Sequence, residues 1–553
     1  MNVAEQIVAQ LVDAGVHRIY GIVGDSLNPI VDAVRKTGGS KKGGIDWIHV
    51  RHEEAAAFAA SAEAQLTGKL AVCAGSCGPG NLHLINGLYD ANRTGAPVLA
   101  IASHIPSVQI GTMYFQETHP DRIFEECSVY NELISSAAQS PRTVNSAIRH
   151  AVGLGGVSVI TLPGDVSDLK AVEHIPTYAP ARPATLAPNA TDIEEAAALL
   201  NKADKVAIFA GAGVEGAHDE VIALADALKA PIGHSLRGKH FIQYDNPFDV
   251  GMTGLLGYGA AAEGMSDADV LILLGTDFPY DQFLPSTPTI QVDTHAEKLG
   301  RRTDVGLAIH AQVKPFIEAL LPHLRAGRSD SFLKSKIKKH SEIMHAPVGA
   351  YTRNVEKMHP IHPEYAAHLL NETAAKDAIF TADTGMCNVW TARYIDPLGT
   401  RRLIGSLLHG SMANALPMAL GAQVAYPERQ VVSVSGDGGL SMLLGELITA
   451  KMYDLPVKVV VFNNSTLGMV KLEMQLTASR TSRRMSPIRI TRRSPVQLAS
   501  TRSASRTRHA WRTRTARRSQ HPAPPSLRSS RIRTPSRFRR PSRAARSSVS
   551  RPQ

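Results

Sequence analysis

The architecture of this chain can be inferred from residues 436–464, which begin Gly436-Asp437-Gly438-Gly439 and end Asn463-Asn464. Residues 431–435, before the first motif, form a β-branched run that turns at glycines, which predicts a buried parallel strand leading into a helix. Another apolar run, residues 457–462, precedes the asparagine pair and predicts the next strand. One βαβ unit therefore places an Asp carboxylate and an Asn amide at the carboxyl ends of neighbouring strands, where open α/β sheets bind ligands.

The chemistry of these side chains suits a metal-bound diphosphate. Hard oxygen ligands at two strand ends favour Mg²⁺, which usually also takes phosphate oxygens from its substrate. The glycines let a diphosphate approach the backbone at a helix N-terminus. An ordinary turn between two strands is the alternative for Gly-Asp-Gly alone. The spacing to the Asn pair resembles the thiamine diphosphate signature, in which Gly-Asp-Gly is followed about two dozen residues later by Asn-Asn.

That resemblance implies a magnesium-dependent thiamine diphosphate site. It implies that Asp437 and Asn464 hold Mg²⁺ through their side chains and that Thr466 contributes its backbone carbonyl. The other residues that it assigns to this cofactor are Gly410, Ser411, Met412, Gly438, Gly439, Leu467 and Gly468.

The composition is that of a globular protein with room for about three domains of ordinary size. The chain has 553 residues, of which 43% are hydrophobic, and no apolar run is long enough to span a bilayer. Its start reads as an amphipathic helix without a secretory signal. The cysteines show no disulfide framework and no second Cys/His pair for zinc, so buried free thiols are predicted at Cys73, Cys77, Cys127 and Cys387. These features predict a cytoplasmic protein.

The net charge of +11 combines two unlike regions. Residues 475–553 contain 22 arginines and no lysine, aspartate or glutamate. The remaining 38 basic side chains in residues 1–474 are outnumbered by all 49 acidic ones, a net charge of −11. An acidic, enzyme-like body is therefore joined to a basic tail, and the two need separate interpretations.

Alternating helical patterns and short β-rich runs predict an α/β protein with three doubly wound parallel-sheet domains. The first domain is predicted over residues 1–170, with strands near 19–23, 47–50, 70–73, 98–101 and 157–161, and a proline-rich linker over 171–190. The middle domain is predicted over 191–335 and the third over 355–474. The third domain contains the Gly-Asp-Gly motif.

The middle domain opens with a literal G-x-G-x-x-G, Gly211-Ala212-Gly213-Val214-Glu215-Gly216, after a strand and before a helical pattern. This is a candidate dinucleotide fingerprint. The next strand, near residues 231–234, ends in no acidic residue that could bind a ribose hydroxyl, which weakens an NAD interpretation.

Glu53 is the candidate acid/base residue. It lies in Arg51-His52-Glu53-Glu54, at the start of a helix that directly follows a predicted strand. In the enzymes that this chain resembles, a glutamate at this place hydrogen-bonds the cofactor's aminopyrimidine and assists removal of the thiazolium C2 proton, a role that rewards a shifted pKa. The alternative for a glutamate at a helix N-terminus is a cap that stabilises the helix dipole.

Further motifs narrow the resemblance to the pyruvate oxidase branch, and within it to the bacterial quinone-dependent pyruvate dehydrogenases. The resemblance covers about residues 1–474, and the segments that carry it are Gly75-Ser76-Cys77-Gly78-Pro79-Gly80-Asn81, Tyr114-Phe115-Gln116-Glu117-Thr118-His119-Pro120, Leu236-Arg237-Gly238-Lys239, Gly251-Met252-Thr253-Gly254, Gly275-Thr276-Asp277-Phe278-Pro279-Tyr280 and His409-Gly410-Ser411-Met412-Ala413-Asn414-Ala415.

This resemblance implies a pyrimidine-binding first domain, an FAD-binding middle domain and a diphosphate-binding third domain. Enzymes of this kind place thiamine diphosphate between the first domain of one subunit and the third domain of another, so a homotetramer is expected. Met412 would be the apolar wedge that bends the cofactor, although methionine in such a turn also serves as a gap-filler. Phe115 and Gln116 would face the substrate, with packing as the alternative for the aromatic residue.

FAD binding is expected at glycine-rich backbones and at strand ends of the middle domain. A purely structural middle domain is the alternative, since some relatives have one. The candidate FAD residues are Gly211, Gly213, Arg237, Gly254, Leu255, Leu256, Gly257, Asp277, Phe278, Pro279, Tyr280 and Asp293.

The implied reaction is oxidative decarboxylation of pyruvate to acetate and carbon dioxide. Glu53 would help to generate the reactive carbanion of the cofactor, and electrons would pass from the carbanion-enamine through FAD to a quinone. An acetolactate synthase-like carboligase, which keeps FAD without redox use, is the nearest alternative. An inactive truncated subunit or a basic-tailed nucleic-acid binder is an alternative from a different class.

The segment from Gln475 departs from the family pattern, because acidic residues and apolar periodicity vanish, and it is predicted to be disordered. It is either a basic arm that binds nucleic-acid phosphates or the product of a shifted reading frame in a GC-rich gene. The frameshift is favoured because the break falls inside a domain that needs further strands, and no specific nucleic-acid partner is predicted. The family's lipid-binding end is not recognised here, so a peripheral position at the inner face of the cell membrane rests on the resemblance alone.

Overall fold

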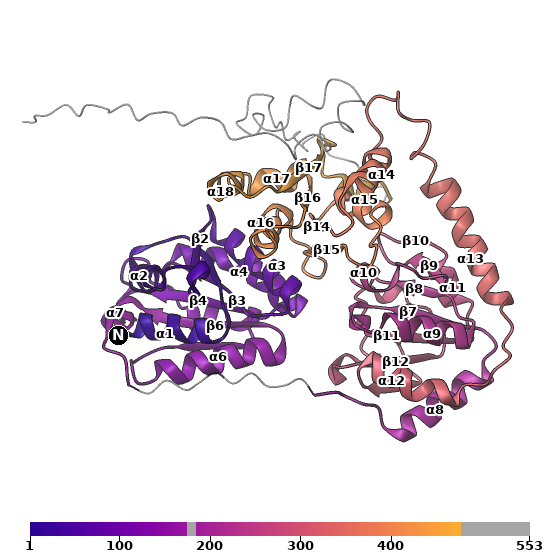
Figure 1. Ribbon diagram of the computed structural model, residues 1–553, viewed down its shortest axis with the longest axis horizontal. Helices are drawn as coiled ribbons and strands as arrows, with labels where there is room; N and C mark the ends of the chain where they lie inside the picture. The colour runs from indigo at the N-terminus through magenta and orange to yellow at the C-terminus, as the bar shows by residue number, and fades with distance from the viewer. Residues whose placement is uncertain (174–177, 179–183, 477–553) are drawn as a thin grey trace, which may run out of the picture. The chain divides into compact units, whose positions relative to one another are not determined.

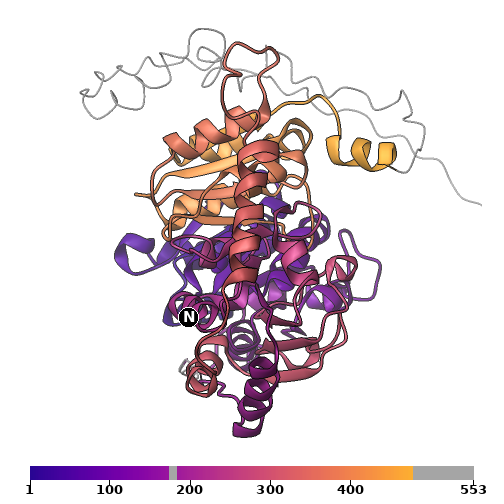
Figure 2. The same ribbon diagram turned by 90° about the vertical axis from the view of Figure 1, so that its right-hand side faces the viewer.

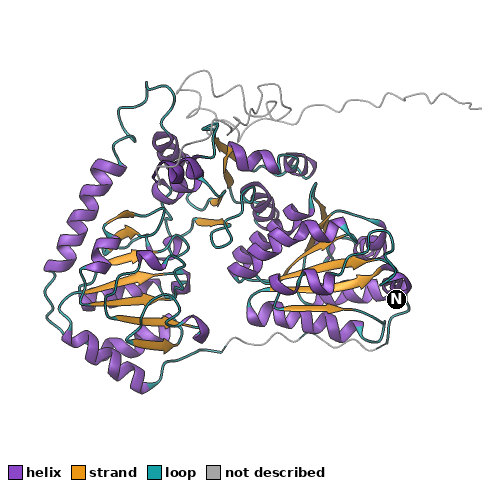
Figure 3. Cartoon of the chain, turned by 180° about the vertical axis from the view of Figure 1, so that it is seen from behind, coloured by secondary structure: helices purple, strands orange, loops and turns teal. Residues whose placement is uncertain are grey.

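Three sheets of mainly parallel strands organise the part of the chain that the structure describes, each flanked by helices (Figures 1 and 3). The structure is a computed structural model, and it describes residues 1–173, Tyr178 and 184–476. These residues belong to one unit, Met1–Ile490. The predicted basic tail beyond Leu476 and much of the predicted linker 171–190 lie outside the described residues.

The first sheet has six parallel strands in the order β2-β1-β3-β4-β6-β5, the doubly wound arrangement predicted from the alternating pattern. The sequence did not predict β5. The elements are β1 (Arg18–Gly21), β2 (Asp46–His49), β3 (Ala71–Gly75), β4 (Val98–His104), β5 (Tyr130–Leu133), β6 (Val157–Pro163), α1 (Val3–Asp13), α2 (Asn28–Lys36), α3 (Glu53–Thr67), α4 (Pro79–Thr94), α5 (Pro120–Ile123), α6 (Ser140–Leu154) and α7 (Gly164–Asp168).

Helix α3 is buried along almost its whole length, and its composition explains how. Seven of its first ten residues are alanines or Phe58, and they pack between α4 and α16 (Ala415–Ala425). Glycines on the neighbouring helices allow the close approach: a Cβ at Gly421 of α16 would clash with the carbonyl oxygen of Ala59, and one at Gly87 of α4 with the Cβ of Ala57. Small side chains on three helices therefore hold the start of α3, and with it Glu53, in a fixed place.

The middle sheet has seven strands in the order β10-β9-β8-β7-β11-β12-β13, and it corrects the expectation of an all-parallel sheet. Its edge strand β10 runs antiparallel to β9, because the chain returns at once through the turn at residues 253–257. The elements are β7 (Val206–Ala210), β8 (Ile232–His234), β9 (Asp249–Met252), β10 (Tyr258–Gly259), β11 (Val270–Leu274), β12 (Thr289–Asp293), β13 (Leu307–His310), α8 (Ala190–Lys202), α9 (His218–Leu228), α10 (Lys239–Ile242), α11 (Ala261–Ser266), α12 (Val313–Leu320) and α13 (Ser331–Ile343).

The G-x-G-x-x-G segment has a packing role in this structure. A short 3₁₀ turn, Ala212–Val214, follows β7, and the helix α9 begins later, at His218. A Cβ at Gly213 would lie 2.6 Å from the Cα of Gly275, and one at Gly211 would clash with the Gly275 carbonyl oxygen. The two glycines therefore let the loops after β7 and β11 lie against each other at the carboxyl edge of the sheet.

The third sheet has four parallel strands in the order β15-β14-β16-β17, seen in orange in Figure 2 with helices on both faces. Strand β16 is buried, whereas the edge strand β17 is partly exposed along its length. The elements are β14 (Ile379–Ala382), β15 (Arg402–Gly405), β16 (Val431–Gly436), β17 (Lys458–Phe462), α14 (Pro363–Thr373), α15 (Met386–Tyr394), α16, α17 (Asp437–Met442), α18 (Glu446–Met452) and α19 (Gly468–Leu476).

The structure tests two expectations, one about membrane-spanning helices and one about the state of the cysteines. Among the described residues, no helix is both long and apolar enough to cross a membrane. All four cysteines are buried free thiols, as predicted. Burial raises the pKa of the Cys387 thiol to about 12 and that of the Cys127 thiol likewise to about 12.

Candidate cofactor site

The Gly-Asp-Gly and Asn-Asn motifs meet at the carboxyl edge of the third sheet. Strand β16 ends at Gly436, which pairs with Phe462 at the end of β17, so Asp437 and Asn464 follow neighbouring strand ends. Asp437 is the first residue of α17, and its side chain is 2% exposed. The predicted βαβ geometry is confirmed.

A cavity of about 350 Å³ opens at this edge. Most residues that the resemblance assigned to thiamine diphosphate line it. They are Gly410, Met412, Asp437, Gly438, Gly439, Asn464, Thr466, Leu467 and Gly468. Glu53, described below, and Ser411 are the exceptions; the Ser411 hydroxyl donates to the Met412 carbonyl and accepts a hydrogen bond from Asn86 Nδ2. The Ser411 side chain thus stabilises the loop that lies next to the cavity.

The oxygen atoms in this cavity fit a magnesium ion. Asp437 Oδ2 is buried and has no hydrogen-bond partner among the described residues. Asn464 Oδ1 accepts from the backbone N–H of Thr466, which draws the chain into a turn at the strand end. A carboxylate, an amide oxygen and a backbone carbonyl are hard donors of the kind that Mg²⁺ prefers. An uncompensated buried carboxylate oxygen is costly unless a cation or donor reaches it.

Asp383 is a buried carboxylate next to the cavity residues Thr384 and Gly439, and the sequence interpretation missed it. It directly follows β14, the strand beside β16, and it is 1% exposed. Burial raises the pKa of its carboxyl to about 7, against the opposing effect of backbone N–H donors. Its Oδ1 accepts from Asn414 Nδ2 at 3.3 Å, and its Oδ2 has no partner among the described residues. A polar residue directly after a third buried strand was the signal that could have identified it.

Asp383 also explains one of the motif glycines. A Cβ at Gly439 would clash with Asp383 Oδ2. Gly439 was expected to leave room for a diphosphate. In this structure it leaves room for the Asp383 carboxylate. Left-handed backbone also adjoins the predicted site residues, at Ala413 (φ 68°) beside Met412 and at Ser465 (φ 53°) beside Asn464. Non-glycine residues in this region store strain, which tends to collect at functional turns.

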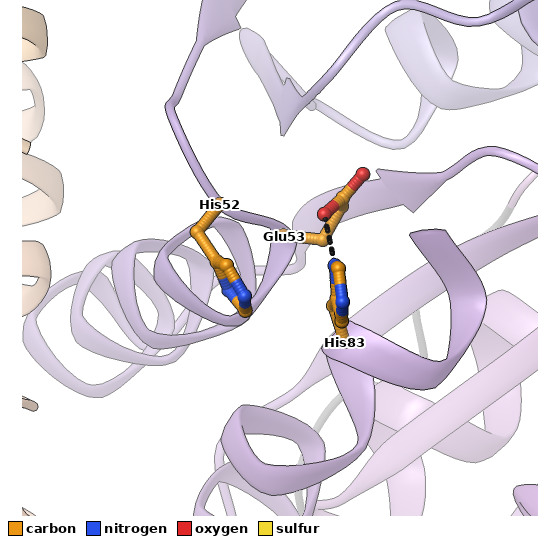
Figure 4. A group of neighbouring side chains, drawn as sticks. All are labelled: His52, Glu53 and His83. Carbon is orange, nitrogen blue, oxygen red and sulfur yellow. Dashed lines mark hydrogen bonds and ion pairs between the residues drawn. The ribbon is translucent and has the colours of Figure 1, made fainter. Parts of the chain in front are cut away.

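Glu53 is the first residue of α3 and is 6% exposed. Its Oε2 lies 2.9 Å from His83 Nδ1, and the His83 ring stacks on the His52 ring at a centroid distance of 4.3 Å (Figure 4). Burial, and then the neighbouring His83, lower the pKa of His52. Glu53 therefore already has a hydrogen-bonding partner within the first domain.

These three side chains could also hold a metal ion. Their potential ligand atoms lie within 4.8 Å of one another, and no other such group occurs among the described residues. Two imidazoles favour zinc or another transition metal over Mg²⁺. However, His52 Nδ1 already accepts from the N–H of Glu54 as the N-cap of α3, so the group is explained as a helix start and a hydrogen-bonded acid.

The structure does not bring Glu53, Phe115 or Gln116 to the cavity. The described residues that line the cavity begin at Leu236, so none comes from the first domain. Phe115 is 78% exposed on a loop. Gln116 has a left-handed backbone (φ 63°), and its side-chain oxygen accepts from the Cys77 thiol at 3.3 Å. Within one chain, the predicted acid/base end and the predicted metal end of the site are separate.

The predicted FAD residues also divide. Gly254, Leu255, Leu256, Phe278 and Tyr280 line the same cavity as Asp437. The other candidates do not line it.

Asp277 pairs with Arg301 and Arg302, and Asp293 accepts from the N–H of His295. The carbonyl of Gly257 accepts from Arg393, and Pro279 does not line the cavity. Arg237 donates to the carbonyl of Thr94 and lines a second cavity of about 350 Å³ together with His240 and Arg402.

Comparison with known proteins assigns the family. The N-terminal thiamine pyrophosphate-binding domain of thiamine pyrophosphate enzymes matches residues 1–123, their central domain matches 193–320, and their C-terminal thiamine pyrophosphate-binding domain matches 383–517. The chain belongs to the thiamine pyrophosphate enzyme family. Because the last match continues to residue 517, the departure predicted from Gln475 stays a prediction.

Individual relatives are similar over most of the chain. A 42.6 kDa protein from Pseudomonas amyloderamosa, encoded in an isoamylase 3′ region, is 54% identical over 60% of this chain and 83% of its own length. Pyruvate oxidase of Lactiplantibacillus plantarum is 32% identical over 84% of this chain and 77% of its own. The large subunit of acetolactate synthase isozyme 2 of Escherichia coli is 31% identical over 86% of this chain and 85% of its own.

Proposed function

We propose that this protein is a thiamine diphosphate-, Mg²⁺- and FAD-dependent oxidoreductase that converts pyruvate to acetate and carbon dioxide and passes the electrons to a quinone. The observation that carries this proposal is the shared cavity. The candidate metal and diphosphate residues around Asp437 and the candidate flavin residues Gly254, Phe278 and Tyr280 line one space. A flavin held there would lie close to the place where the substrate is decarboxylated.

The chain's own residues would then have separate tasks. Bound thiamine diphosphate supplies an electron sink for the bond between the keto carbon and the carboxylate of the substrate. Asp437, Asn464 and Thr466 would hold Mg²⁺ through oxygen atoms, and Met412, in the same cavity, would support the bent cofactor. Glu53 would exchange a proton with the aminopyrimidine through its carboxylate, and Phe115 and Gln116 would face the substrate.

A second copy of the chain is part of this proposal. Glu53 lies outside the cavity of its own chain, so a complete site needs the first domain of another subunit. A closed symmetric assembly, with a homotetramer as our proposal, would bring each Glu53 to a neighbour's cavity. A position at the inner face of the cell membrane belongs to the same proposal, because a quinone acceptor is dissolved in the membrane.

An acetolactate synthase-like carboligase is the second candidate, because a relative of that name is as similar as the pyruvate oxidase. A visible spectrum of the purified chain decides between them, recorded before and after anaerobic pyruvate with thiamine diphosphate and Mg²⁺. Bleaching of bound flavin supports the oxidoreductase. A flavin that stays oxidised while acetolactate accumulates supports the carboligase, and a chain that binds no flavin contradicts the FAD assignment.

The basic tail from Gln475 also affects the result of this experiment. We propose that residues from Gln475 come from a shifted reading frame, because their composition changes abruptly after the cofactor motif. Resequencing the gene tests this directly. If the frame is shifted, we expect the chain with the original frame restored to bleach its flavin faster than the present chain.

A further inference from the structure

Glu446 of α18 lies directly behind the start of the helix that carries Glu53. Its side chain is 1% exposed, and Oε1 accepts from the backbone N–H of Arg51 at 2.8 Å and from that of His52 at 3.0 Å. Oε2 accepts from the hydroxyl of Thr449 at 2.7 Å. The two N–H groups immediately before Glu53 are therefore satisfied by a carboxylate from the third domain.

A second side chain of the same segment holds the strand before this turn. The hydroxyl of Tyr453, one residue after α18, accepts from the N–H of His49 at 2.7 Å and donates to the carbonyl of Trp47 at 3.2 Å. The side chain of Arg51 lies next to Gly445, since a Cβ added at Gly445 would be 3.7 Å from the Arg51 Cβ. Residues 445–453 thus hold the backbone from Trp47 in β2 to His52, the residue before α3.

These contacts have a physical consequence for Glu53. The first N–H groups of a helix have no partner inside the helix and need an external acceptor. Here the His52 ring accepts from the N–H of Glu54, and Glu446 accepts from the N–H of His52, the N-cap residue, and from that of Arg51 just before it. Burial raises the pKa of the Glu446 carboxyl, while its N–H and hydroxyl donors oppose that effect. The start of α3 depends on an acceptor that its own domain does not supply.

We propose that Glu446 is a positioning residue for Glu53: it fixes the backbone from which the Glu53 carboxylate reaches the cofactor. This inference rests on the acid/base role proposed for Glu53. Within one chain it also connects Glu53, which would serve a neighbour's cavity, to that chain's own metal end, because α18 follows α17, whose first residue is Asp437, after only three residues. Small errors in the position of a reacting group cost large factors in rate, about 10²-fold for a displacement of 1 Å.

The test compares Glu446→Ala with Glu446→Gln, whose amide oxygen can still accept both N–H bonds. Glu63→Ala is the matched control, because Glu63 is also a buried glutamate (8% exposed), hydrogen-bonded to Tyr20, ten residues further along α3. The first readout is amide hydrogen exchange of the cofactor-free chain over residues 47–56. We expect faster exchange in Glu446→Ala, near-normal exchange in Glu446→Gln, and no local change in Glu63→Ala.

The second readout is turnover with the concentration of thiamine diphosphate that gives half-saturation. We expect Glu446→Ala to lower kcat by about 10²-fold with little change in half-saturation, and Glu446→Gln to restore most of the rate. Wild-type turnover together with unchanged amide exchange in Glu446→Ala overturns the positioning role. If Glu446→Ala does not fold, Tyr453→Phe decides: it should lower kcat and expose the His49 amide, and normal values for both overturn the proposal.

The two proposals fail in different ways. Normal turnover of Glu53→Gln contradicts the acid/base role of Glu53, whatever Glu446→Ala does. An inactive Glu53→Gln beside a fully active, locally protected Glu446→Ala leaves the proposed function intact and overturns only the positioning role.

Discussion

The two ends of the candidate site differ in how complete they are within one chain. At the metal end, Asp437, Asn464 and Met412 line one cavity, and Asp437 carries a buried oxygen without a partner among the described residues. At the acid/base end, Glu53 already has a partner in His83, and Phe115, predicted to face the substrate, is exposed. In our proposal, a cation completes the metal end, whereas a second subunit completes the acid/base end.

This difference follows from how each end is built. Strand ends of a single parallel sheet deliver Asp437 and Asn464 to the same edge, so the sheet alone brings them together. Glu53 is delivered by a helix of another domain, and nothing in that domain's sheet directs it to the cavity. Substitutions can therefore disrupt each end separately. At the acid/base end they should change turnover, and at the metal end they should change cofactor binding.

The largest effect is expected at the acid/base end. Glu53→Gln should lower turnover by about 10²–10⁴-fold, the range of general acid–base catalysis. Flavin content should stay near wild type, because Glu53 does not line the cavity that the candidate flavin residues line. Steady-state rates and cofactor titrations check this, with Glu125→Gln, an exposed carboxylate of the same domain, as the control. A turnover near that of the control would contradict the assignment.

The next largest effect is expected at the metal end and concerns binding. Asp437→Asn removes the charge that would face Mg²⁺ and should weaken Mg²⁺-dependent binding of thiamine diphosphate by at least about 10-fold, a loss that even outer-shell changes cause at metal sites. Equilibrium dialysis at several Mg²⁺ concentrations measures it. Ser441→Ala, which removes a hydrogen bond inside α17, is the control and should bind normally. Equal affinities for both variants would place the ion elsewhere.

A mixture of these two variants tests whether the ends belong to one chain or to two. If each site combines Glu53 of one subunit with Asp437 of another, a mixed pair has one intact site. At a thiamine diphosphate concentration too low to load Asp437→Asn, the Glu53→Gln and Asp437→Asn proteins, dissociated and reassembled together, should then recover about one quarter of wild-type activity in a two-fold symmetric pair. Rates measured before and after mixing provide the check. No recovery in proven mixed assemblies would mean that each chain completes its own site.

The sequence predicted the ends of the site unequally, for the same physical reason. Short-range patterns sufficed for the β16–α17–β17 unit, because β-branched runs and glycine turns determine which residues follow a strand. They also predicted the start of α3 at Glu53. They could not predict long-range contacts. One is the pair of hydrogen bonds that Glu446, 393 residues away from Glu53 in the chain, makes to the backbone before α3. The other is the antiparallel pairing of strand β10. Asp383 was overlooked because β14 itself was not recognised.

The smallest effects compare two glycines, one at each end. Gly439→Ala would place a Cβ against Asp383 Oδ2, a carboxylate that is itself fixed by Asn414 and the N–H of Thr384, so we expect a loss of about 1–3 kcal/mol in the free energy of unfolding. Gly80→Ala would place its Cβ 3.0 Å from Glu53 Oε1, the end of a side chain that can rotate.

Gly80 is the second residue of α4, and alanine is favoured over glycine by about 0.5–1 kcal/mol at most in a helix, which offsets a contact of its Cβ with the Ser76 Cβ at 3.3 Å, so Gly80→Ala should be close to neutral for stability. Chemical unfolding of both variants without cofactor measures the difference. The comparison is informative because it separates rigidity from burial: both carboxylates are buried, but only Asp383 is held by more than one hydrogen bond from neighbouring backbone and side chain. A larger loss for Gly80→Ala than for Gly439→Ala would mean that Glu53 is already fixed before any partner or cofactor reaches it.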